Sequence, residues 1–305
     1  MSDTTAQQRA EECSEEVRAW ADRGAIHQLA GHGVFVVDVP AADPDPALEP
    51  LLVLHGFPTS TFDYAGIIDR LAAHRRVVAA DFLGFGLSDK PDLHYTMGLQ
   101  ADLIVALTAE LGLTRVALLS HDMGDTVGGE LLARNTEGAW PIEVTRRVVT
   151  NGSIYIGLAQ LTDGQQFLLA LPDERVAEGL GPQPEGLAAS LVATLSPTTT
   201  LGVADLLPHG ELVAALDGGR VLPRTIRYIE ERRANERRFT GAIESHPSPL
   251  TIVWGDDDPI AVTAMTAELV AARPDAALTI LDGIGHYPML EAPERFLDAV
   301  LPALG

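Results

Sequence analysis

The chain has 305 residues, 46% of them hydrophobic, and a formal net charge of −22, which suits one large domain with a buried core. The negative charge excludes nucleic acid as a natural partner, because phosphate backbones are bound by basic surfaces. No apolar run is long enough to span a bilayer and no signal peptide is evident, so we expect no membrane role and, with Cys13 as the single thiol, a cytoplasmic protein without disulfides.

The first half of the chain predicts strands and helices in alternation. Residues 8–22 are expected to form a helix, and residues 25–30 and 33–39 a hairpin. The short apolar run PLLVLH (50–55) then predicts a buried strand. Further strands are expected at 76–81, 115–120 and 146–151, and helices at 60–73, 97–112 and 123–135. This alternation is typical of βαβ units and a parallel sheet.

The alternation stops after residue 152. Residues 153–240 contain helical stretches broken by prolines and no clear strand. Strands are expected again at 249–255 and 277–283, with helices at 261–272 and 291–303. We therefore expect a core formed by residues 1–152 and 241–305, and a helical cap of residues 153–240 inserted between two core strands. Such an insertion lies over the carboxyl ends of the strands, where open α/β sheets bind ligands.

One basic run, RTIRYIEERRANERR (224–238), lies near the end of the predicted cap. Its glutamates are interleaved so that Arg227/Glu231 and Arg232/Glu236 are four residues apart, the spacing of ion pairs on a helix. We expect a salt-bridged helix face. The alternative is a site for an anionic substrate.

A strained turn is predicted in LLSHDMGD (118–125), where a strand gives way to a helix. Ser120, Asp122 and Gly124 fit a small–x–nucleophile–x–small pattern, in which small residues permit a tight turn against a close helix. Such an elbow lifts its central side chain out of the sheet to a helix N-terminus, where negative charge is stabilised. The alternative for Asp122 is an ordinary helix N-cap, which aspartate often supplies.

Two further side chains follow predicted strands and favour catalysis. GDDDP supplies Asp258 after one strand, and GHYP supplies His286 after the last strand. Nucleophile, acid and base then occur in the chain order expected of α/β-hydrolases. Asp256 and Asp257 are the alternatives to Asp258. We expect no metal, because no clustered ligand spacing occurs, and no cofactor.

The segment HGFP (55–58) also follows a predicted strand. It places the backbone N–H of Phe57 near the elbow, where together with the N–H of Met123 it can form an oxyanion hole. His55 in the same segment is a candidate for contact with the substrate. The alternative is an ordinary Gly–Pro turn.

Five motifs carry a resemblance to a known family: HGFPTS (55–60), DFLGFGLSDKP (81–91), SHDMGD (120–125), WGDDDP (254–259) and GHYPMLEAPERF (285–296). Together they resemble α/β-hydrolases of the epoxide hydrolase and haloalkane dehalogenase superfamily. Within it, the chain resembles the mesoderm-specific transcript proteins, which also share an asparagine–glycine pair where Asn151 and Gly152 stand. The resemblance implies an α/β-hydrolase fold, a mostly parallel sheet flanked by helices with an inserted helical cap.

The resemblance also implies roles for the candidate residues. Nucleophile, acid and base are Asp122, Asp258 and His286, and the oxyanion donors are the backbones of Phe57 and Met123. An aspartate side chain in water has a pKa of about 3.9 and is charged at neutral pH, so it attacks a saturated carbon without a base and leaves an ester. Water activated by His286 then cleaves the ester. A direct serine-type esterase does not fit this arrangement.

The leaving group distinguishes the candidate reactions. Haloalkane dehalogenases of the superfamily have a halide-binding tryptophan directly after the nucleophile, and fluoroacetate dehalogenases have an arginine there. This chain has Met123, which donates no hydrogen bond. An epoxide oxygen needs a proton, which epoxide hydrolases supply from cap tyrosines. Tyr228 resembles one of these, and Tyr155 is the candidate for the second; the alternative is that both are packing residues.

We therefore expect a hydrolase that opens a neutral epoxide to a diol through an alkyl-enzyme ester. The alternatives are haloalkane dehalogenase-like or ester hydrolysis and, in a different class, a non-catalytic ligand-binding protein with the same fold. The expected partners are water and a small, neutral, apolar substrate. A monomer or a homodimer is expected.

Overall fold

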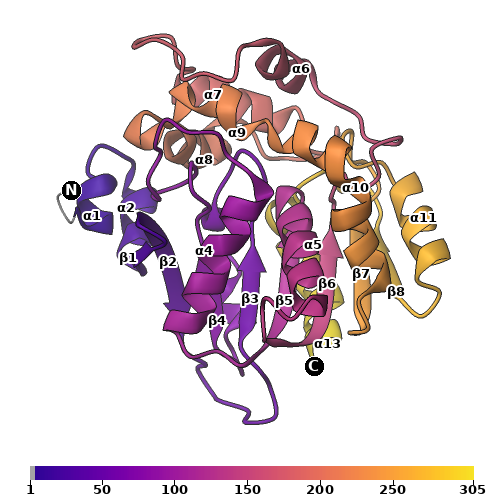
Figure 1. Ribbon diagram of the computed structural model, residues 1–305. Helices are drawn as coiled ribbons and strands as arrows, with labels where there is room; N and C mark the ends of the chain where they lie inside the picture. Colours follow the sequence, from indigo (N-terminus) through magenta and orange to yellow (C-terminus); the bar gives the residue numbers. More distant parts are fainter. Residues whose placement is uncertain (1–3) are drawn as a thin grey trace.

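The computed structural model describes residues 4–305, and its centre is one eight-stranded sheet with helices on both faces (Figure 1). The strand order is β1-β2-β4-β3-β5-β6-β7-β8. β1 (Gly24–Leu29) and β2 (His32–Val39) form the expected hairpin, and β2 pairs antiparallel with β4 (Val77–Ala80). All remaining pairs are parallel, so the predicted mostly parallel sheet flanked by helices is confirmed.

The central strands are short apolar segments covered on both faces. Every residue of β3 (Leu51–Leu54) is buried, as is every residue of β5 (Arg115–His121) except the first. Parallel strands that are covered on both faces must be apolar along their whole length. For this reason runs such as PLLVLH are recognisable as strands in the sequence. The sheet is completed by β6 (Glu143–Thr150), β7 (Leu250–Gly255) and β8 (Ala277–Leu281).

Each face of the sheet has its own apolar core. In β3, Leu52 and Leu54 belong to one core and Leu51 and Val53 to the other, because successive side chains of a strand point to opposite faces. The first core also contains residues of α4 (Met97–Glu110), α5 (Met123–Thr136) and α11 (Ala264–Ala272). The second contains residues of α2 (Glu15–Ala21), α3 (Ile68–Leu71), α12 (Pro288–Glu291) and α13 (Pro293–Leu304).

Two predicted helices are interrupted. The helix expected at 8–22 is divided into α1 (Ala6–Arg9) and α2, because the backbone N–H and the hydroxyl of Ser14 donate to Glu211 at 2.9 and 2.6 Å. The helix expected at 60–73 is divided into a 3₁₀ turn, η1 (Thr61–Tyr64), and α3. At the start of η1, the backbone N–H and the hydroxyl of Thr61 donate to Asp81 at 2.9 and 2.6 Å. A local sequence pattern contains neither this contact nor that of Ser14 with Glu211.

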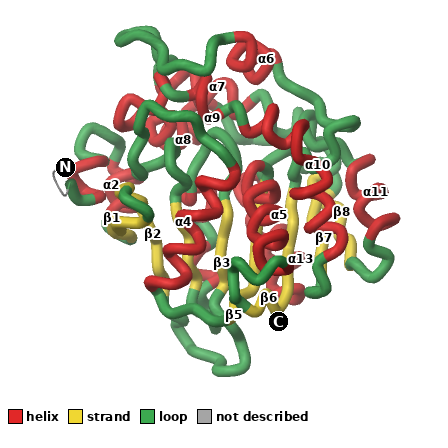
Figure 2. Tube along the Cα trace, in the orientation of Figure 1, coloured by secondary structure: helices red, strands yellow, loops and turns green. Residues whose placement is uncertain are grey.

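A mainly helical segment lies between β6 and β7, over the carboxyl ends of the parallel strands (Figures 1 and 2). We call this segment the insert. Its last helix continues to Ser245, beyond the expected boundary at residue 240, and none of its described residues forms a strand. Its elements are α6 (Asp163–Ala170), α7 (Pro184–Val192), α8 (Val203–Ala214), η2 (Ala215–Arg220), α9 (Leu222–Thr225) and α10 (Tyr228–Ser245).

Cationic side chains join the insert to the sheet domain. The Nζ of Lys90 donates to the carbonyl oxygens of Leu212, Val213 and Ala215 at 2.8, 3.2 and 2.7 Å. These carbonyls lie at the C-terminal end of α8, where a positive charge is favourable. Burial lowers the pKa of Lys90 to about 7, and nearby Asp81 opposes that shift. Arg238 of α10 also pairs with Glu130 of α5 at 2.6 Å.

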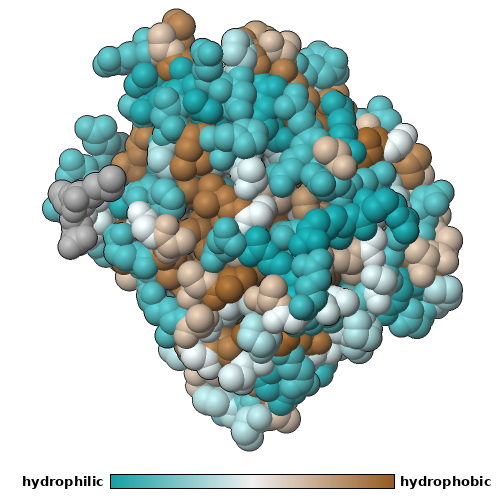
Figure 3. Space-filling view, in the orientation of Figure 1, coloured by the Kyte–Doolittle hydropathy of each residue, from teal (hydrophilic) through white to brown (hydrophobic). Residues whose placement is uncertain are grey.

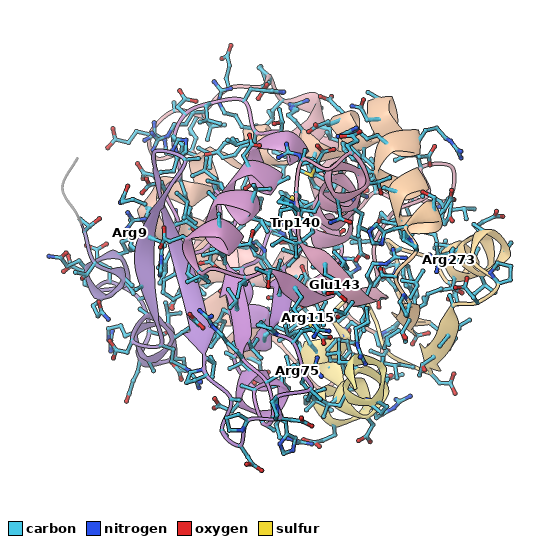
Figure 4. The ribbon with its side chains drawn as sticks, turned by 60° about the horizontal axis from the view of Figure 1, so that its bottom comes forward. Arg9, Arg75, Arg115, Trp140, Glu143 and Arg273 are labelled. Atoms are coloured by element: carbon cyan, nitrogen blue, oxygen red, sulfur yellow. The ribbon has the colours of Figure 1, made fainter. Side chains whose placement is uncertain are left out.

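The opposite end of the sheet is held by a different group of charges (Figure 4). The buried carboxylate of Glu49 lies 4.0 Å from Arg75, 3.8 Å from Arg115 and 3.2 Å from Arg146. Arg75 also donates to the carbonyl of Leu304 at the end of α13. These contacts fix the C-terminal helix at the end of the molecule away from the insert. In the described part of the chain, no helix combines the length and apolarity needed to cross a membrane.

Candidate active site

Asp122 lies at a sharp turn between β5 and α5. Its φ of 48° and ψ of −111° are rare for a residue with a side chain. Its N–H donates to the carbonyl of Thr150 at 3.2 Å, which ties the turn to the neighbouring strand β6. Asp122 does occupy the N-cap position of α5, but its carboxylate makes no capping hydrogen bond there, so helix capping does not account for this side chain. Strain of this kind is typical of functional positions.

Two glycines make room for this turn. A Cβ at Gly124 would lie 2.4 Å from the carbonyl oxygen of Leu54. A Cβ at Gly56 would lie 2.7 Å from the Nδ1 of His121 and 3.0 Å from the Cβ of Asp122. Side chains at either position would displace the elbow from the end of β3. The small residues of the sequence pattern therefore have a direct steric cause.

His286 and Asp258 form a buried pair next to the elbow. The Nδ1 of His286 lies 2.7 Å from the Oδ2 of Asp258. The other carboxylate oxygen of Asp258 accepts from the N–H groups of Ile260 and Ala261 at 2.7 and 2.9 Å. The pair fixes the imidazole so that its Nε2 remains for proton transfer.

The neighbouring aspartates are engaged elsewhere. Asp256 accepts from the backbone of Gly283 at 2.6 Å, and Asp257 accepts from the hydroxyl of Ser196 at 2.9 Å. Neither carboxylate makes a hydrogen bond to His286. The geometry therefore favours Asp258 as the acid over both alternatives.

Asn151 supports the acid, a contact that the sequence motifs did not suggest. Its Nδ2 donates to the Oδ2 of Asp258 at 2.7 Å, and its Oδ1 accepts from the N–H of Gly255 at 3.0 Å. Its φ of 47° is a left-handed value that asparagine tolerates better than most residues. Asn151 directly follows β6, so the rule that identified Asp258 and His286 as strand-end side chains applies to it too.

The protonated form of His286 is stabilised by its neighbours. Burial alone would lower the pKa of His286, but the charges of Asp258, Asp122 and Glu291 raise it to about 9. Two carboxylates of the site thus act on one imidazole. The protonation state of His286 therefore depends on the charge of Asp122.

The Phe57 half of the expected oxyanion hole is formed. The N–H of Phe57 donates to the Oδ2 of Asp122 at 2.9 Å. Met123 is the first residue of α5, where N–H groups have no partner within the helix. Both predicted donors thus lie at the elbow. One oxygen of Asp122 is held, and the other remains for reaction with a ligand.

Two histidines, His55 and His121, connect the loops around the site through hydrogen bonds to the backbone. The Nδ1 of His55 donates to the carbonyl of Gly56 at 2.8 Å, and its Nε2 accepts from the N–H of Phe82 at 2.9 Å. Both ring nitrogens of His55 therefore bind backbone, which corrects its expected contact with the substrate. The Nε2 of His121 donates to the carbonyl of His286 at 2.7 Å and so links the elbow to the loop of the base. Burial lowers the pKa of His121 to about 4.

The structure brings one of the two candidate tyrosines to the site. Tyr228 is buried at the start of α10, with its ring centroid 5.4 Å from that of Phe57. Burial and the charge of Asp122 raise the pKa of Tyr228 above its usual value. The hydroxyl of Tyr155 instead donates to Glu244 at 2.9 Å, on the outer part of α10. Tyr155 is therefore not part of this site.

The basic run of α10 does not form the expected ion pairs. Arg232 is buried and donates to the hydroxyl of Thr126 at 2.8 Å and to the carbonyl of Ser153 at 2.7 Å. Its guanidinium lies 4.9 Å from the centre of the Tyr228 ring, within cation–π range. Glu236, its expected partner, accepts from the N–H of Ile156 at 2.8 Å. Arg232 thus fixes Tyr228 and α10 over the elbow.

A cavity of about 310 Å³ connects the catalytic loops to the surface of the insert. Phe57, His286 and Tyr287 lie on its core side, and most of the other lining residues belong to the insert, with leucine the most frequent type among them. Phe167 and Leu180 also line the cavity, yet 64% and 72% of their surface is exposed, so they mark its mouth. Hydrophobic surface is visible on the insert in Figure 3. None of the described residues that line the cavity is Asp, Glu, Lys or Arg.

Comparisons with known proteins identify the family and the fold of the chain. Residues 51–299 match a family described as "Alpha/beta hydrolase family". The chain is 38% identical over 292 residues to the "Putative hydrolase LipZ" of Mycobacterium tuberculosis, covering 95% of this chain and 99% of that protein. It is 32% identical over 301 residues to the mesoderm-specific transcript homolog protein of Homo sapiens, covering 94% of this chain and 88% of that protein. The crystal structure of a haloalkane dehalogenase variant from Bradyrhizobium elkanii superposes with a TM-score of 0.71 at 20% identity, covering 92% of this chain and 95% of that chain. At this identity the likeness shows the fold alone.

Proposed function

The chain belongs to the alpha/beta hydrolase family, and from that premise we propose that it hydrolyses a neutral, apolar epoxide through an ester on Asp122. The observation that carries the proposal is the strained elbow, where the carboxylate of Asp122 makes no capping bond to α5 and one of its oxygens is bound by the N–H of Phe57. A carboxylate held in this way is suited to attack on a saturated carbon. Such an attack needs no base, because a carboxylate reacts as the anion and has no proton to lose.

In the first step, the Oδ1 of Asp122 attacks one epoxide carbon and forms the ester bond. The carbon–oxygen bond of the epoxide breaks, and its electron pair goes to the oxygen. The hydroxyl of Tyr228 supplies the proton and is left as a phenolate. The proposal is supported by the burial of Tyr228 beside Phe57 and by the electrostatic effect of Asp122 on it.

In the second step, the Nε2 of His286 takes a proton from water, and the hydroxide adds to the ester carbon of Asp122. The N–H groups of Phe57 and Met123 stabilise the resulting oxyanion. When this tetrahedral intermediate collapses, the bond between the carbonyl carbon of Asp122 and the ester oxygen breaks. The diol leaves with the ester oxygen and takes the proton of the added hydroxyl, which restores the carboxylate. The proton on His286 returns to Tyr228, so epoxide and water give diol with no net proton change.

The charge coupling within the site suits this order of steps. Esterification removes the negative charge of Asp122, which is one of the causes that raise the pKa of His286. The pKa of His286 therefore falls once the ester has formed. The imidazolium then releases its proton to solvent and is a free base when the ester is cleaved, and it regains a proton from solvent once the carboxylate is restored.

The cavity supports a neutral and apolar substrate. Of the described lining residues only His286 carries a charge, so a charged group held against the insert would lose its hydration without gaining a partner. Leu187 and Leu191 of α7 and Leu222 of α9 instead offer apolar contact. The insert thus acts as a cap that selects the substrate.

The experiment that tests this function is a trap for the ester. His286→Gln removes the base, and the variant is incubated with 1,2-epoxyhexane, with 1-bromohexane and with an ester of hexanoic acid, followed by intact-mass measurement. We expect a gain equal to the whole epoxide, mapped to Asp122, and no gain in the double variant Asp122→Asn/His286→Gln. A gain equal to a hexyl group would replace epoxide opening with dehalogenation. Turnover of the hexanoate ester by the wild type, without any adduct from the other two probes, would point to ester hydrolysis.

A further inference from the structure

Tyr287, the residue that follows the proposed base, lies inside the active-site cavity. Its side chain is 1% exposed and is part of the cavity lining. Its ring meets that of His286 edge to face, with centroids 5.0 Å apart and an interplanar angle of 89°. It also lies 5.0 Å from the ring of His121. Tyr287 is thus fixed by the two histidines that border the nucleophile.

The hydroxyl of Tyr287 is hydrogen-bonded to Phe57, the residue whose N–H also binds the carboxylate of Asp122. It donates to the carbonyl oxygen of Phe57 at 3.2 Å, while the N–H of Phe57 donates to Asp122 at 2.9 Å. Phe57 therefore sets the position of the phenol relative to the attacking carboxylate. A hydrogen bond of 3.2 Å is long for an O–H donor and therefore weak. The hydroxyl loses little stabilisation when it turns from this carbonyl to a closer acceptor.

The charges around Tyr287 keep its hydroxyl protonated. Burial and the charges of Asp63 and Asp122 raise the pKa of Tyr287 well above its usual value, and the Thr59 hydroxyl opposes that shift. The charge of Asp122 is among the causes that raise the pKa of both Tyr287 and Tyr228. A phenol that stays protonated at neutral pH is a hydrogen-bond donor, the group that an opening epoxide needs at its oxygen.

We propose that Tyr287 is the second phenol of the site, donating a hydrogen bond to the epoxide oxygen while Tyr228 transfers the proton. This inference rests on the proposed function and specifies which group binds the leaving oxygen. The hydroxyl of Tyr287 turns from the carbonyl of Phe57 to the substrate oxygen and keeps its own proton. One donor then comes from the sheet domain and one from the insert, so the site is complete only when the insert is seated. The role expected of Tyr155 falls to Tyr287.

The test compares two epoxides that differ in the basicity of the leaving oxygen. The rate of ester accumulation is measured by intact mass in the His286→Gln background with 1,2-epoxypropane and with 3,3,3-trifluoro-1,2-epoxypropane. Tyr287→Phe is expected to slow the reaction of 1,2-epoxypropane by roughly 10- to 100-fold, the effect of losing one hydrogen bond to a developing charge. The trifluoro compound forms a less basic alkoxide, so its reaction should slow by less. Tyr155→Phe is the matched control and should change neither rate.

The outcomes separate this inference from the proposed function. Equal slowing of both epoxides by Tyr287→Phe would indicate that the hydroxyl only supports the loop of Phe57, and would overturn the inference. An unchanged rate with 1,2-epoxypropane would overturn it as well. Failure of His286→Gln itself to form an adduct with any epoxide would instead remove the proposed function on which the inference depends.

Discussion

The two sides of the active site are built in different ways. On the side of the sheet, Asp122, His286, Asp258 and Asn151 each follow a strand and are buried. Short hydrogen bonds join the last three to one another, and the N–H of Phe57 holds Asp122. On the side of the insert, the cavity is lined mostly by apolar side chains from short helices and loops. Under the proposed function, the sheet fixes the atoms that react, whereas the insert provides the surface whose shape selects the substrate.

This difference indicates where substitutions should act. Changes on the sheet side should alter rate constants, because they displace charged groups that are held by directional bonds. Changes on the insert side should alter mainly the apparent affinity, because they remove apolar area without moving the reacting groups. The exceptions are Tyr228 and Arg232, which bring polar groups of the insert to the elbow.

The largest effect on the sheet side is expected from Asp258→Asn. The variant loses the charge that orients and stabilises the imidazolium of His286, so cleavage of the ester should slow by about 10²- to 10⁴-fold. A stopped-flow burst with accumulation of the ester measures this step. Asp257→Asn is the matched control, since Asp257 binds Ser196 and not His286. Equal losses in both variants would contradict the assignment of Asp258 as the acid.

A smaller effect is expected from Asn151→Gly. Glycine adopts the left-handed backbone of this position but removes the amide that donates to Asp258. The loss of one hydrogen bond to a charged group is worth ~1.5–3 kcal/mol, so ester cleavage should slow by about 10- to 100-fold. Ester formation measured by intact mass should change little. If both steps slowed equally, Asn151 would act on the fold of the loop and not on the acid.

The coupling between Asp122 and His286 predicts a change in pKa. Asp122→Asn removes a negative charge that raises the pKa of His286, so the imidazole should titrate below the value of about 9 expected for the wild type. NMR titration of the His286 ring protons measures both values. The deprotonated base is then present over a wider pH range in the variant. An equal or higher pKa in Asp122→Asn would show that the two groups are not coupled.

The smallest effect is expected at the mouth of the cavity. Phe167→Ser combined with Leu180→Ser removes exposed apolar surface, so KM for 1,2-epoxyhexane should rise by roughly 2- to 10-fold with kcat unchanged. Leu278→Ser is the control, since Leu278 is 43% exposed on β8 and does not line the cavity. A fall in kcat without a change in KM would mean that the mouth residues affect the chemical steps. That result would contradict the distinction between a sheet side that sets rates and an insert side that sets affinity.

The same contrast explains what the sequence predicted. Asp122, Asp258 and His286 were identified because each follows a buried apolar run, and the carboxyl ends of parallel strands meet at one edge. The roles of Tyr155, Tyr287 and the pair Arg232/Glu236 depend on how α10 packs on the elbow. Helical spacing alone predicts that Arg232 binds Glu236, but burial against α5 gives it Thr126 and Ser153 as partners. Such contacts join segments far apart in the chain and leave no local pattern.

The most direct test of the central claim is a single turnover of the wild-type enzyme in ¹⁸O-labelled water. With enzyme in excess over 1,2-epoxyhexane, the oxygen added in the first turnover should come from Asp122. The diol should contain no ¹⁸O, and the peptide that carries Asp122 should gain one ¹⁸O atom. Incorporation of ¹⁸O into the diol in that first turnover, with an unlabelled Asp122, would contradict the account, because water would then have attacked the epoxide directly.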